Sequence, residues 1–347
     1  MKNIKWIAVL LVVFTLLLTA CGGAATATQA AAAEVPMASN QGACTPDAMS
    51  KDNATQLVIG TGGKGGVFYP FGEGLAKILT ANMPGVTTTF IETGGSVDNM
   101  KFIQSGKAQI GFSTVDSAYD AIQGQAAYAE TGKIPACALA VLYTSFVHVI
   151  VSEASGIATV ADMKGRIVSV GDTGSSTEGA ADRILEAAGL DPKADITRQN
   201  LSIADATAAM SAGTINAFFW VGGTPTKAVS DMLASGTKVK FIDASQFVDS
   251  MSVKYGPLYQ AISLPKEVYG TESDVPGIGI GNILFVNANM SEEQAYQILT
   301  VIFAHLDEVH ALHAQAVNLT LDDAVFGSSI PFHPGAIKFY TEKGVWK

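Results

Sequence analysis

Residues 57–70 of the chain read Leu-Val-Ile-Gly-Thr-Gly-Gly-Lys-Gly-Gly-Val-Phe-Tyr-Pro. The three apolar residues predict a short buried strand, and the glycine-rich run from Gly60 to Gly66 predicts a tight turn. Pro70 is expected to open a helix that runs to about Ala81, because proline suits the first helical position. A strand, a glycine turn and a helix in this order predict an α/β fold.

The pattern of strand, turn and helix continues along the chain and then occurs a second time. We expect the first copy to go on with strand 86–91, a turn at Gly94-Gly95-Ser96, a helix closed by Gly106, strand 109–112 and helix 113–122. The second copy follows Arg166 as strand 167–170, turn 171–177, helix 178–188, strand 195–199, helix 202–213, strand 215–220, turn 222–224 and a helix opened by Pro225. The repeat is longer than the roughly 20–50 residues of a solenoid unit, so it predicts two similar α/β lobes.

Two long apolar stretches are predicted to join the lobes. Leu139–Val151 and Pro276–Val286 are each long enough to pass from one lobe to the other, and crossing strands of this kind form a hinge. After the second stretch, Ser291 is expected to cap a helix that runs to about His313 and packs on the first lobe. We therefore expect lobe 1 to comprise residues 54–143 plus 278–347, and lobe 2 to comprise residues 144–277.

The composition excludes several classes of protein. The chain has 347 residues, of which 48% are hydrophobic and 15% charged, so it can bury a large core and is not disordered. Its formal net charge of −10 argues against a nucleic-acid-binding protein, which would carry a basic face. We expect a monomer that needs no cofactor.

The first residues predict export. Residues 1–20 hold Lys2 and Lys5, then an apolar run from Trp6 to Leu18, which is typical of a secretory signal peptide. The following Leu18-Thr19-Ala20-Cys21 resembles a bacterial lipobox, so we expect cleavage before Cys21 and its acylation; an ordinary signal or an uncleaved anchor is the alternative. Residues 21–53 are rich in Ala, Thr, Gln and Gly and predict a flexible tether. The protein would then sit outside the cytoplasm, anchored by lipid to the cell membrane.

Two further cysteines, Cys44 and Cys137, follow Cys21. A disulfide between them is permitted in an oxidising compartment, and pairing is favoured over two free thiols because leftover cysteines in exported chains usually pair.

The glycine turns allow two interpretations. Gly60-Thr61-Gly62-Gly63-Lys64-Gly65 satisfies the dinucleotide-binding pattern, but Pro70 places the helix several residues too late for its N–H groups to meet a pyrophosphate. We favour the second interpretation, in which all the turns together form a site for an anion. Each precedes a helix, and helix N-termini offer unpaired N–H groups and about half a positive charge to an anion.

The predicted ligand-binding residues are small, hydroxyl-bearing or aromatic side chains in or beside these turns. They are Gly62, Gly63, Gly66, Tyr69, Ser96, Asn99, Ser113, Thr114, Tyr143, Ser175, Ser176, Thr177, Trp220, Gly222 and Thr224. Each Ser or Thr alone is readily explained as a helix N-cap, and Trp220 as part of an apolar core. Their clustering at matching turns favours a binding cleft between the lobes.

Other chemistry is weakly represented. The chain has no Gly-x-Ser-x-Gly motif for a nucleophile and no His-Glu-x-x-His motif or clustered cysteines for zinc, so we predict neither catalysis nor a metal site. His148 lies in an apolar stretch and is interpreted as a core residue. Lys64 is interpreted as an exposed loop side chain.

The sequence as a whole resembles the TAXI family, the solute-binding proteins of TRAP transporters. The resemblance spans about 57–344 and rests on Ile59–Pro70, Thr93–Asn99, Gly174–Glu178, Ala217–Gly223 and Pro331–Ala336. It implies a two-lobed periplasmic-binding-protein fold of type II. It also implies capture of a small organic anion such as glutamate, glutamine or 2-oxoglutarate, and its delivery to a TRAP permease. Like that family, this chain has no arginine near the turns, since Arg166, Arg183 and Arg198 fall elsewhere. An exported sensor that regulates a membrane partner is the alternative function, and an exported enzyme is the third.

Overall fold

The computed structural model describes residues 44, 49–50 and 53–346, and all structural statements below concern these residues. The predicted signal peptide 1–20, Cys21 and most of the predicted tether 21–53 lie outside the described residues. The described residues belong to one compact unit. Within the described part of the chain, no helix is both long and apolar enough to cross a membrane.

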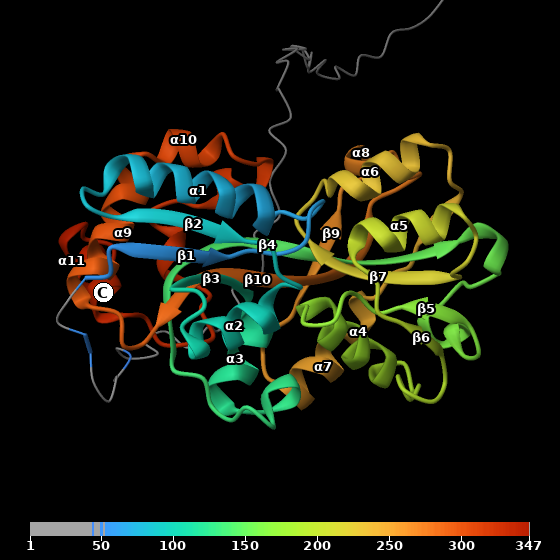
Figure 1. Ribbon diagram of the computed structural model, residues 1–347. Helices are drawn as coiled ribbons and strands as arrows, with labels where there is room; N and C mark the ends of the chain where they lie inside the picture. Colours follow the sequence, from blue (N-terminus) through green and yellow to red (C-terminus); the bar gives the residue numbers. More distant parts are fainter. Residues whose placement is uncertain (1–43, 45–48, 51–52, 347) are drawn as a thin grey trace, which may run out of the picture. The chain divides into compact units, whose positions relative to one another are not determined.

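The elements follow the order that the repeat predicts (Figure 1). The first half of the molecule contains β1 (Gln56–Gly60), α1 (Phe68–Asn82), β2 (Thr87–Ile91), α2 (Ser96–Ser105), β3 (Ile110–Thr114) and α3 (Val115–Gln123). The second half contains β5 (Ile167–Ser169), α4 (Ser176–Ala187), β6 (Thr197–Gln199), α5 (Ile203–Ser211), β7 (Ala217–Gly222) and α6 (Lys227–Ala234). Both halves thus alternate strand and helix in the same way.

Two long strands, β4 (Ala136–Ser152) and β10 (Val275–Asn287), join the halves. They pair with each other in antiparallel register from Gly279 opposite Phe146 to Asn287 opposite Ala136. The whole sheet has the order β2-β1-β3-β10-β4-β7-β5-β6, with β8 (Val239–Phe241) on β4 and β9 (Gln260–Leu264) on β10. Each half therefore has its first strand between its second and third strands, with a crossing strand next to the third.

This arrangement confirms the predicted fold class, an α/β fold of two halves joined by two crossing strands. The apolar stretches that the sequence singled out are buried along most of their length, as strands covered on both faces must be. The exact lobe boundaries at 143/144 and 277/278 stay a prediction.

The remaining helices complete both halves. α7 (Val248–Tyr255) and α8 (Lys266–Tyr269) precede β10, whereas α9 (Glu292–Ala304), α10 (Leu306–His310) and α11 (Pro334–Glu342) follow it. Ser291 caps α9 by accepting the Gln294 N–H at 3.0 Å, as predicted. α9 contacts α1 and α11, so the chain does return to the first half after β10 (Figure 1).

Several predicted helix boundaries were wrong. The helix predicted to start at Ser113 begins at Val115, because Ser113 and Thr114 still belong to β3. α1 begins at Phe68, with Pro70 inside its first turn, where a missing N–H costs no intrahelical bond. α6 begins at Lys227 rather than at Pro225, after a cis peptide bond between Thr224 and Pro225. The helix predicted over 292–313 is interrupted at His305, whose ψ of 33° does not continue α9.

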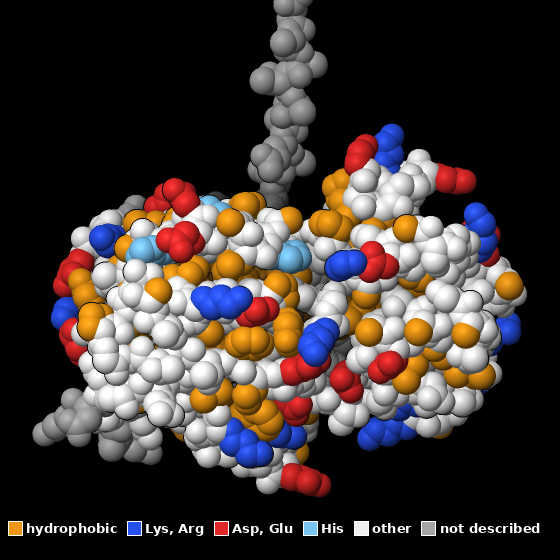
Figure 2. Space-filling model, turned by 45° about the horizontal axis from the view of Figure 1, so that its top comes forward, with side chains coloured by type: hydrophobic (Ala, Val, Ile, Leu, Met, Phe, Trp, Pro, Cys, Tyr) orange, Lys and Arg blue, Asp and Glu red, His pale blue; other side chains and the backbone are white. Residues whose placement is uncertain are grey.

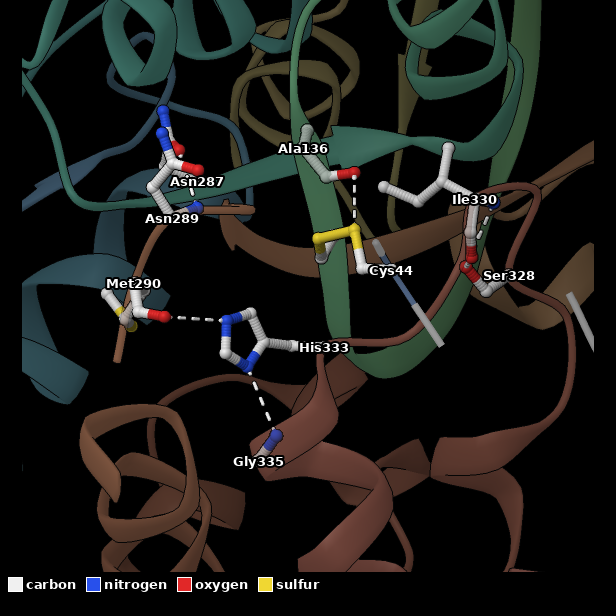
Figure 3. The surroundings of a disulfide bond; sticks show 10 residues. Cys44, Ala136, Asn287, Asn289, Met290, Ser328, Ile330, His333 and Gly335 are labelled. Atoms are coloured by element: carbon white, nitrogen blue, oxygen red, sulfur yellow. Dashed lines mark hydrogen bonds between the residues drawn. A yellow bond between two sulfur atoms is a disulfide. The ribbon is translucent and has the colours of Figure 1, made fainter. Parts of the chain in front are cut away.

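A disulfide bond joins Cys44 to Cys137 of β4, the pair that the sequence favoured (Figure 3). Their Cα atoms are 6.0 Å apart, and the Cys44 N–H also donates to the Phe332 carbonyl at 2.9 Å. Residue 44 is thus attached both to a crossing strand and to the segment that leads into α11.

His333, which lies near this disulfide, caps α11 as a neutral imidazole (Figure 3). Its Nδ1 accepts the Gly335 N–H at 3.2 Å, and its Nε2 contacts the Met290 carbonyl at 3.0 Å, which requires the proton on Nε2. Burial lowers the pKa of His333 from its ordinary value of 6.5 to about 4. Protonation of Nδ1 would remove the cap.

The His333→Asn variant should therefore weaken the pH dependence of stability. Between pH 6.5 and about 4, the unfolded chain binds a proton at His333 that the folded chain does not, so folding stability falls as the pH falls. This histidine accounts for about 3 kcal/mol of that loss. Asparagine is a good N-cap but does not titrate. Urea unfolding at pH 4.5 and 7 measures the difference, and an unchanged pH dependence in the variant would contradict the assignment.

A buried charge cluster connects the two halves. Arg183 of α4 forms an ion pair with Asp120 and lies 3.6 Å from Asp116 Oδ2, and both acids belong to α3. It also donates to the Tyr259 hydroxyl, just before β9. Although burial opposes the charge of Arg183, the nearby Asp116, Tyr259 and Asp120 raise its pKa. The cluster is satisfied only while α3 and α4 are in contact.

Replacing Arg183 with methionine should destabilise the protein by about 3–5 kcal/mol, because two buried carboxylates lose their partner. Arg198→Met is the matched control. Arg198 pairs with Asp182 and Glu178 within the second half and is more exposed, so its loss should cost about 1 kcal/mol or less. Denaturant unfolding of both variants tests this, and equal losses would show that the cluster contributes nothing special.

Candidate functional site

A pocket lies where the two halves meet at the crossing strands. Its cavity measures about 50 Å³. The lining comes from the glycine turns, the helix N-termini and the crossing strands: Gly62, Gly63, Gly66, Val67, Phe68, Gly94, Gly95, Ser96, Thr114, Tyr143, Ser145, Asp172, Ser175, Ser176, Thr177, Ser202, Ile203, Trp220, Val221, Gly222 and Asn282. Both halves contribute, so the site is complete only when they are together.

The α2 N-terminus contacts the other half directly. The Val97 and Asp98 N–H groups donate to the Gly174 carbonyl at 3.0 and 3.1 Å. A Cβ atom on Gly174 would lie 2.4 Å from an oxygen of Asp98, and one on Gly94 would lie 2.3 Å from the Thr173 carbonyl oxygen. Gly94 is needed because the opposite backbone approaches so closely, and Gly174 because side chains rarely adopt its φ of +84°. The α2 N–H groups are therefore engaged by a protein carbonyl in this structure.

Two of the hydroxyl groups at the α4 N-terminus are bonded to other described residues of the protein, and one is not. Ser175 is the N-cap: it accepts the Glu178 N–H at 3.3 Å and donates to the Asp172 carbonyl at 2.7 Å. Thr177 accepts the Val221 N–H at 3.1 Å, which fixes α4 to β7. Ser176 lines the pocket, and its hydroxyl makes no hydrogen bond to any described residue. It is the hydroxyl at this helix end that is available to a ligand.

Trp220 forms a fixed wall of the pocket. Its Nε1 donates to Thr226 Oγ1 at 2.9 Å, and the Thr226 N–H donates to the Tyr269 hydroxyl at 2.7 Å. Tyr269 in turn lies 3.0 Å from Nε2 of His148. On the other side, a Cβ on Gly66 would lie 3.1 Å from the indole ring. The indole is thus held from behind and covered by the first glycine turn.

His148 is a core residue, in line with the sequence-based interpretation. It is fully buried in β4, and burial lowers its pKa from 6.5 to about 4. It contacts the carbonyls of Phe146 and Trp220 through Nδ1 and supports the pocket wall through Tyr269.

The charges around the pocket are mostly acidic. Asp172 is the only charged residue in the lining, and burial, followed by the repulsion of Asp98, Asp205 and Glu178, raises its pKa. Figure 2 shows acidic side chains gathered in the middle of the view. Lys64 is exposed and lies 3.6 Å from Glu92, so it is a surface side chain, as expected.

Most of the predicted ligand-binding residues lie together in the lining. These are Gly62, Gly63, Gly66, Ser96, Thr114, Tyr143, Ser175, Ser176, Thr177, Trp220 and Gly222. Their role in binding stays a prediction. Burial raises the pKa of the Tyr143 hydroxyl, so this group is a neutral donor in the pocket.

Four predicted residues are not part of the lining. The Asn99 amide is used within the first half, bonding the Thr61 and Phe112 carbonyls at 2.6 and 2.9 Å. Ser113 alternates with Thr114 along β3 and therefore faces away from the pocket.

The other two predicted residues outside the lining are Tyr69 and Thr224. Tyr69 packs edge-on against Phe90, with ring centroids 5.5 Å apart. The Thr224 carbonyl accepts a hydrogen bond from the Gln315 side chain.

Sequence reasoning missed several lining residues. Gly94, Gly95, Asp172 and Ser202 lie in turns that it had identified, so the helix-N-terminus argument could have included them. Ser145 and Asn282 lie on the crossing strands, where only the sheet register brings them to the pocket. In the described residues, no group of three or more His, Cys, Asp or Glu side chains is arranged to hold a metal ion.

The fold and the pocket define an α/β protein with a candidate ligand site at the junction of its two halves. The family model described as the NMT1-like family matches residues 59–344, so the chain belongs to this family.

Several solved structures are similar to this chain. One is the alkanesulfonate-binding protein SsuA from Xanthomonas axonopodis pv. citri bound to MOPS, which is 19% identical to this chain. The match covers 85% of this chain and 81% of that chain, with a TM-score of 0.43. Another is the periplasmic aliphatic sulphonate binding protein SsuA from Escherichia coli, with 19% identity, 77% and 76% covered, and a TM-score of 0.41. A third is an ancestral arginine-binding protein bound to arginine, with 14% identity, 76% and 99% covered, and a TM-score of 0.46.

The Ser176→Ala variant should weaken ligand binding by about tenfold without reducing stability, because its hydroxyl has no partner among the described residues. Ser175→Ala is the control. It removes the N-cap of α4 and should cost about 1 kcal/mol of folding stability. Calorimetric titration with a ligand from the screen below, together with thermal unfolding, separates the two effects. A stability loss in Ser176→Ala equal to that in Ser175→Ala would contradict the division of roles.

Proposed function

We propose that the protein is an extracytoplasmic solute-binding protein that captures a small organic carboxylate in the pocket between its halves. The observation that carries this proposal is the composition of the pocket. It is built from helix N-termini, hydroxyls and one aromatic wall, drawn from both halves, and its glycines allow close backbone approach. Such groups suit an anion without a bound cation or an arginine clamp.

The proposed function includes opening and closing of the halves. A cavity of about 50 Å³ is far below the roughly 300–1,000 Å³ of typical ligand pockets, so a solute must enter while the halves are apart. Release of the Gly174 carbonyl would free the Val97 and Asp98 N–H groups for the ligand. The ligand would shift the equilibrium only by its difference in affinity for the two states.

The finer parts of the proposal come from the family resemblance and the N-terminal sequence. The ligand would be similar to glutamate, glutamine or 2-oxoglutarate, and a TRAP-type permease in the membrane would receive it. Acylated Cys21 would anchor the protein to the membrane, and the tether would let it reach the permease. The protein would act as a carrier and not as an enzyme, because the pocket offers no activated nucleophile.

A thermal-shift screen of amino acids, 2-oxo acids and dicarboxylates tests the proposed function. A ligand at 100 times its dissociation constant should stabilise the protein by about 2.7 kcal/mol. The bound solute should then fail to enter cells in which the gene is deleted. If no carboxylate raises the unfolding temperature while sugars or cations do, the proposed ligand class is wrong.

A further inference from the structure

Two buried polar atoms in the pocket lack a hydrogen-bond partner within the described part of the chain. They are Thr114 Oγ1 and Asn282 Oδ1, and their residues are 1% and 0% exposed. Both residues line the cavity. Buried polar atoms almost always have a hydrogen-bond partner in native proteins. Two buried atoms without a partner inside a ligand pocket therefore indicate a place where the ligand forms the missing hydrogen bonds.

The two residues are neighbours in the sheet. Thr114 ends β3 and is directly opposite Asn282 of β10 in the antiparallel register. Side chains opposite each other in such a pair lie on the same face, with Cβ atoms about 4.5–5.5 Å apart. One small ligand group can therefore reach both atoms.

The hydrogen bonds of Asn282 fix which end of its amide faces the ligand. The Asn282 Nδ2 atom donates to the Tyr143 carbonyl at 3.0 Å and to Ser145 Oγ at 2.9 Å. A carbonyl oxygen only accepts, so the NH₂ end must face Tyr143, and Oδ1 is left as an acceptor. Only a hydrogen-bond donor can pair with it.

The charge of the pocket favours a cationic donor. Asp172 is the single charged residue in the lining, and Asp98, Asp205 and Glu178 lie near it. An anion with no positive group would meet repulsion from these carboxylates, whereas a zwitterion would place its carboxylate at the helix N-termini and its ammonium near acceptors.

We propose that Thr114 and Asn282 form a subsite for the ammonium group of the ligand, so that the protein binds amino carboxylates and rejects the matching 2-oxo carboxylates. The inference rests on the proposed function, which allows either class. An oxo group has lone pairs but no hydrogen, so it would leave Asn282 Oδ1 unpaired. Sites built around a hydrogen bond reject analogues that cannot form it far more strongly than sites that read only shape.

Matched pairs of probes test this selectivity. Calorimetric titrations would compare L-glutamate with 2-oxoglutarate, L-alanine with pyruvate and L-phenylalanine with phenylpyruvate, since the members of each pair differ only at the α carbon, which carries an ammonium group in one and an oxo group in the other. We expect at least one amino acid to bind, and to bind more than 100-fold more tightly than its oxo acid. Equal or tighter binding of an oxo acid would overturn the subsite while leaving the proposed function standing. If no member of any pair binds, both the subsite and the small-carboxylate function fail.

The Thr114→Val variant identifies the residue responsible. Valine keeps the shape of threonine and removes a hydroxyl that has no protein partner, so folding stability should not fall. Affinity for the amino acid should fall about tenfold, and the affinity for the oxo acid should not change. Thr88→Val is the control, because Thr88 Oγ1 is also buried and unpaired but lies on the edge strand β2, away from this pocket.

Two results in the variants would contradict the subsite. An equal loss of affinity for both members of a pair in Thr114→Val would place the carboxylate, and not the amine, at this hydroxyl. Unchanged binding of the amino acid would mean that a water molecule occupies the subsite, which the cavity has room to hold.

Discussion

The pairing of β4 with β10 is the constraint on which the rest of the structure depends. Each strand passes from one half to the other, and each pairs with a third strand of one repeat: β10 with β3, and β4 with β7. The two α/β units are therefore joined edge to edge through a shared pair of strands. Because β3 and β7 flank this pair, the turns that follow the strands of both halves converge on one pocket.

The close approach of the two halves restricts which residues can occupy the positions where they touch. Gly94 and Gly174 are required where the α2 N-terminus meets the opposite turn, and Gly66 lies in tight contact with the Trp220 ring where the first turn covers it. Polar contacts hold the same boundary together: the Gly174 carbonyl accepts from α2, and Arg183 bridges α4 and α3. The contacts between the halves thus include polar groups and glycines, beside an apolar core that continues through the crossing strands into both halves.

The fold could be predicted well from the sequence because each strand, turn and helix depends on residues that are close together in the chain. The strand, glycine turn and helix order follows from hydrophobic pattern and turn chemistry, and it holds in both halves. The helix starts near Pro70 and Pro225 were misplaced because proline marks the first turn of a helix without fixing its first residue. Asn282 and Ser145 could not be found, since nothing near them in sequence shows that the register of β10 brings them to Thr114 and Tyr143. The charge cluster at Arg183 was missed for the same reason.

Tryptophan fluorescence tests the central claim most directly, namely that a solute binds between the halves against Trp220. The chain has three tryptophans, of which Trp6 lies in the predicted signal peptide and Trp346 packs on Phe332. In a Trp346→Phe protein that lacks residues 1–20, Trp220 is the sole remaining indole. The account predicts that a carboxylate found by the thermal-shift screen changes the Trp220 emission in a saturable way, with the dissociation constant that calorimetry gives. Calorimetric binding with no change in Trp220 emission would place the ligand elsewhere and contradict the account.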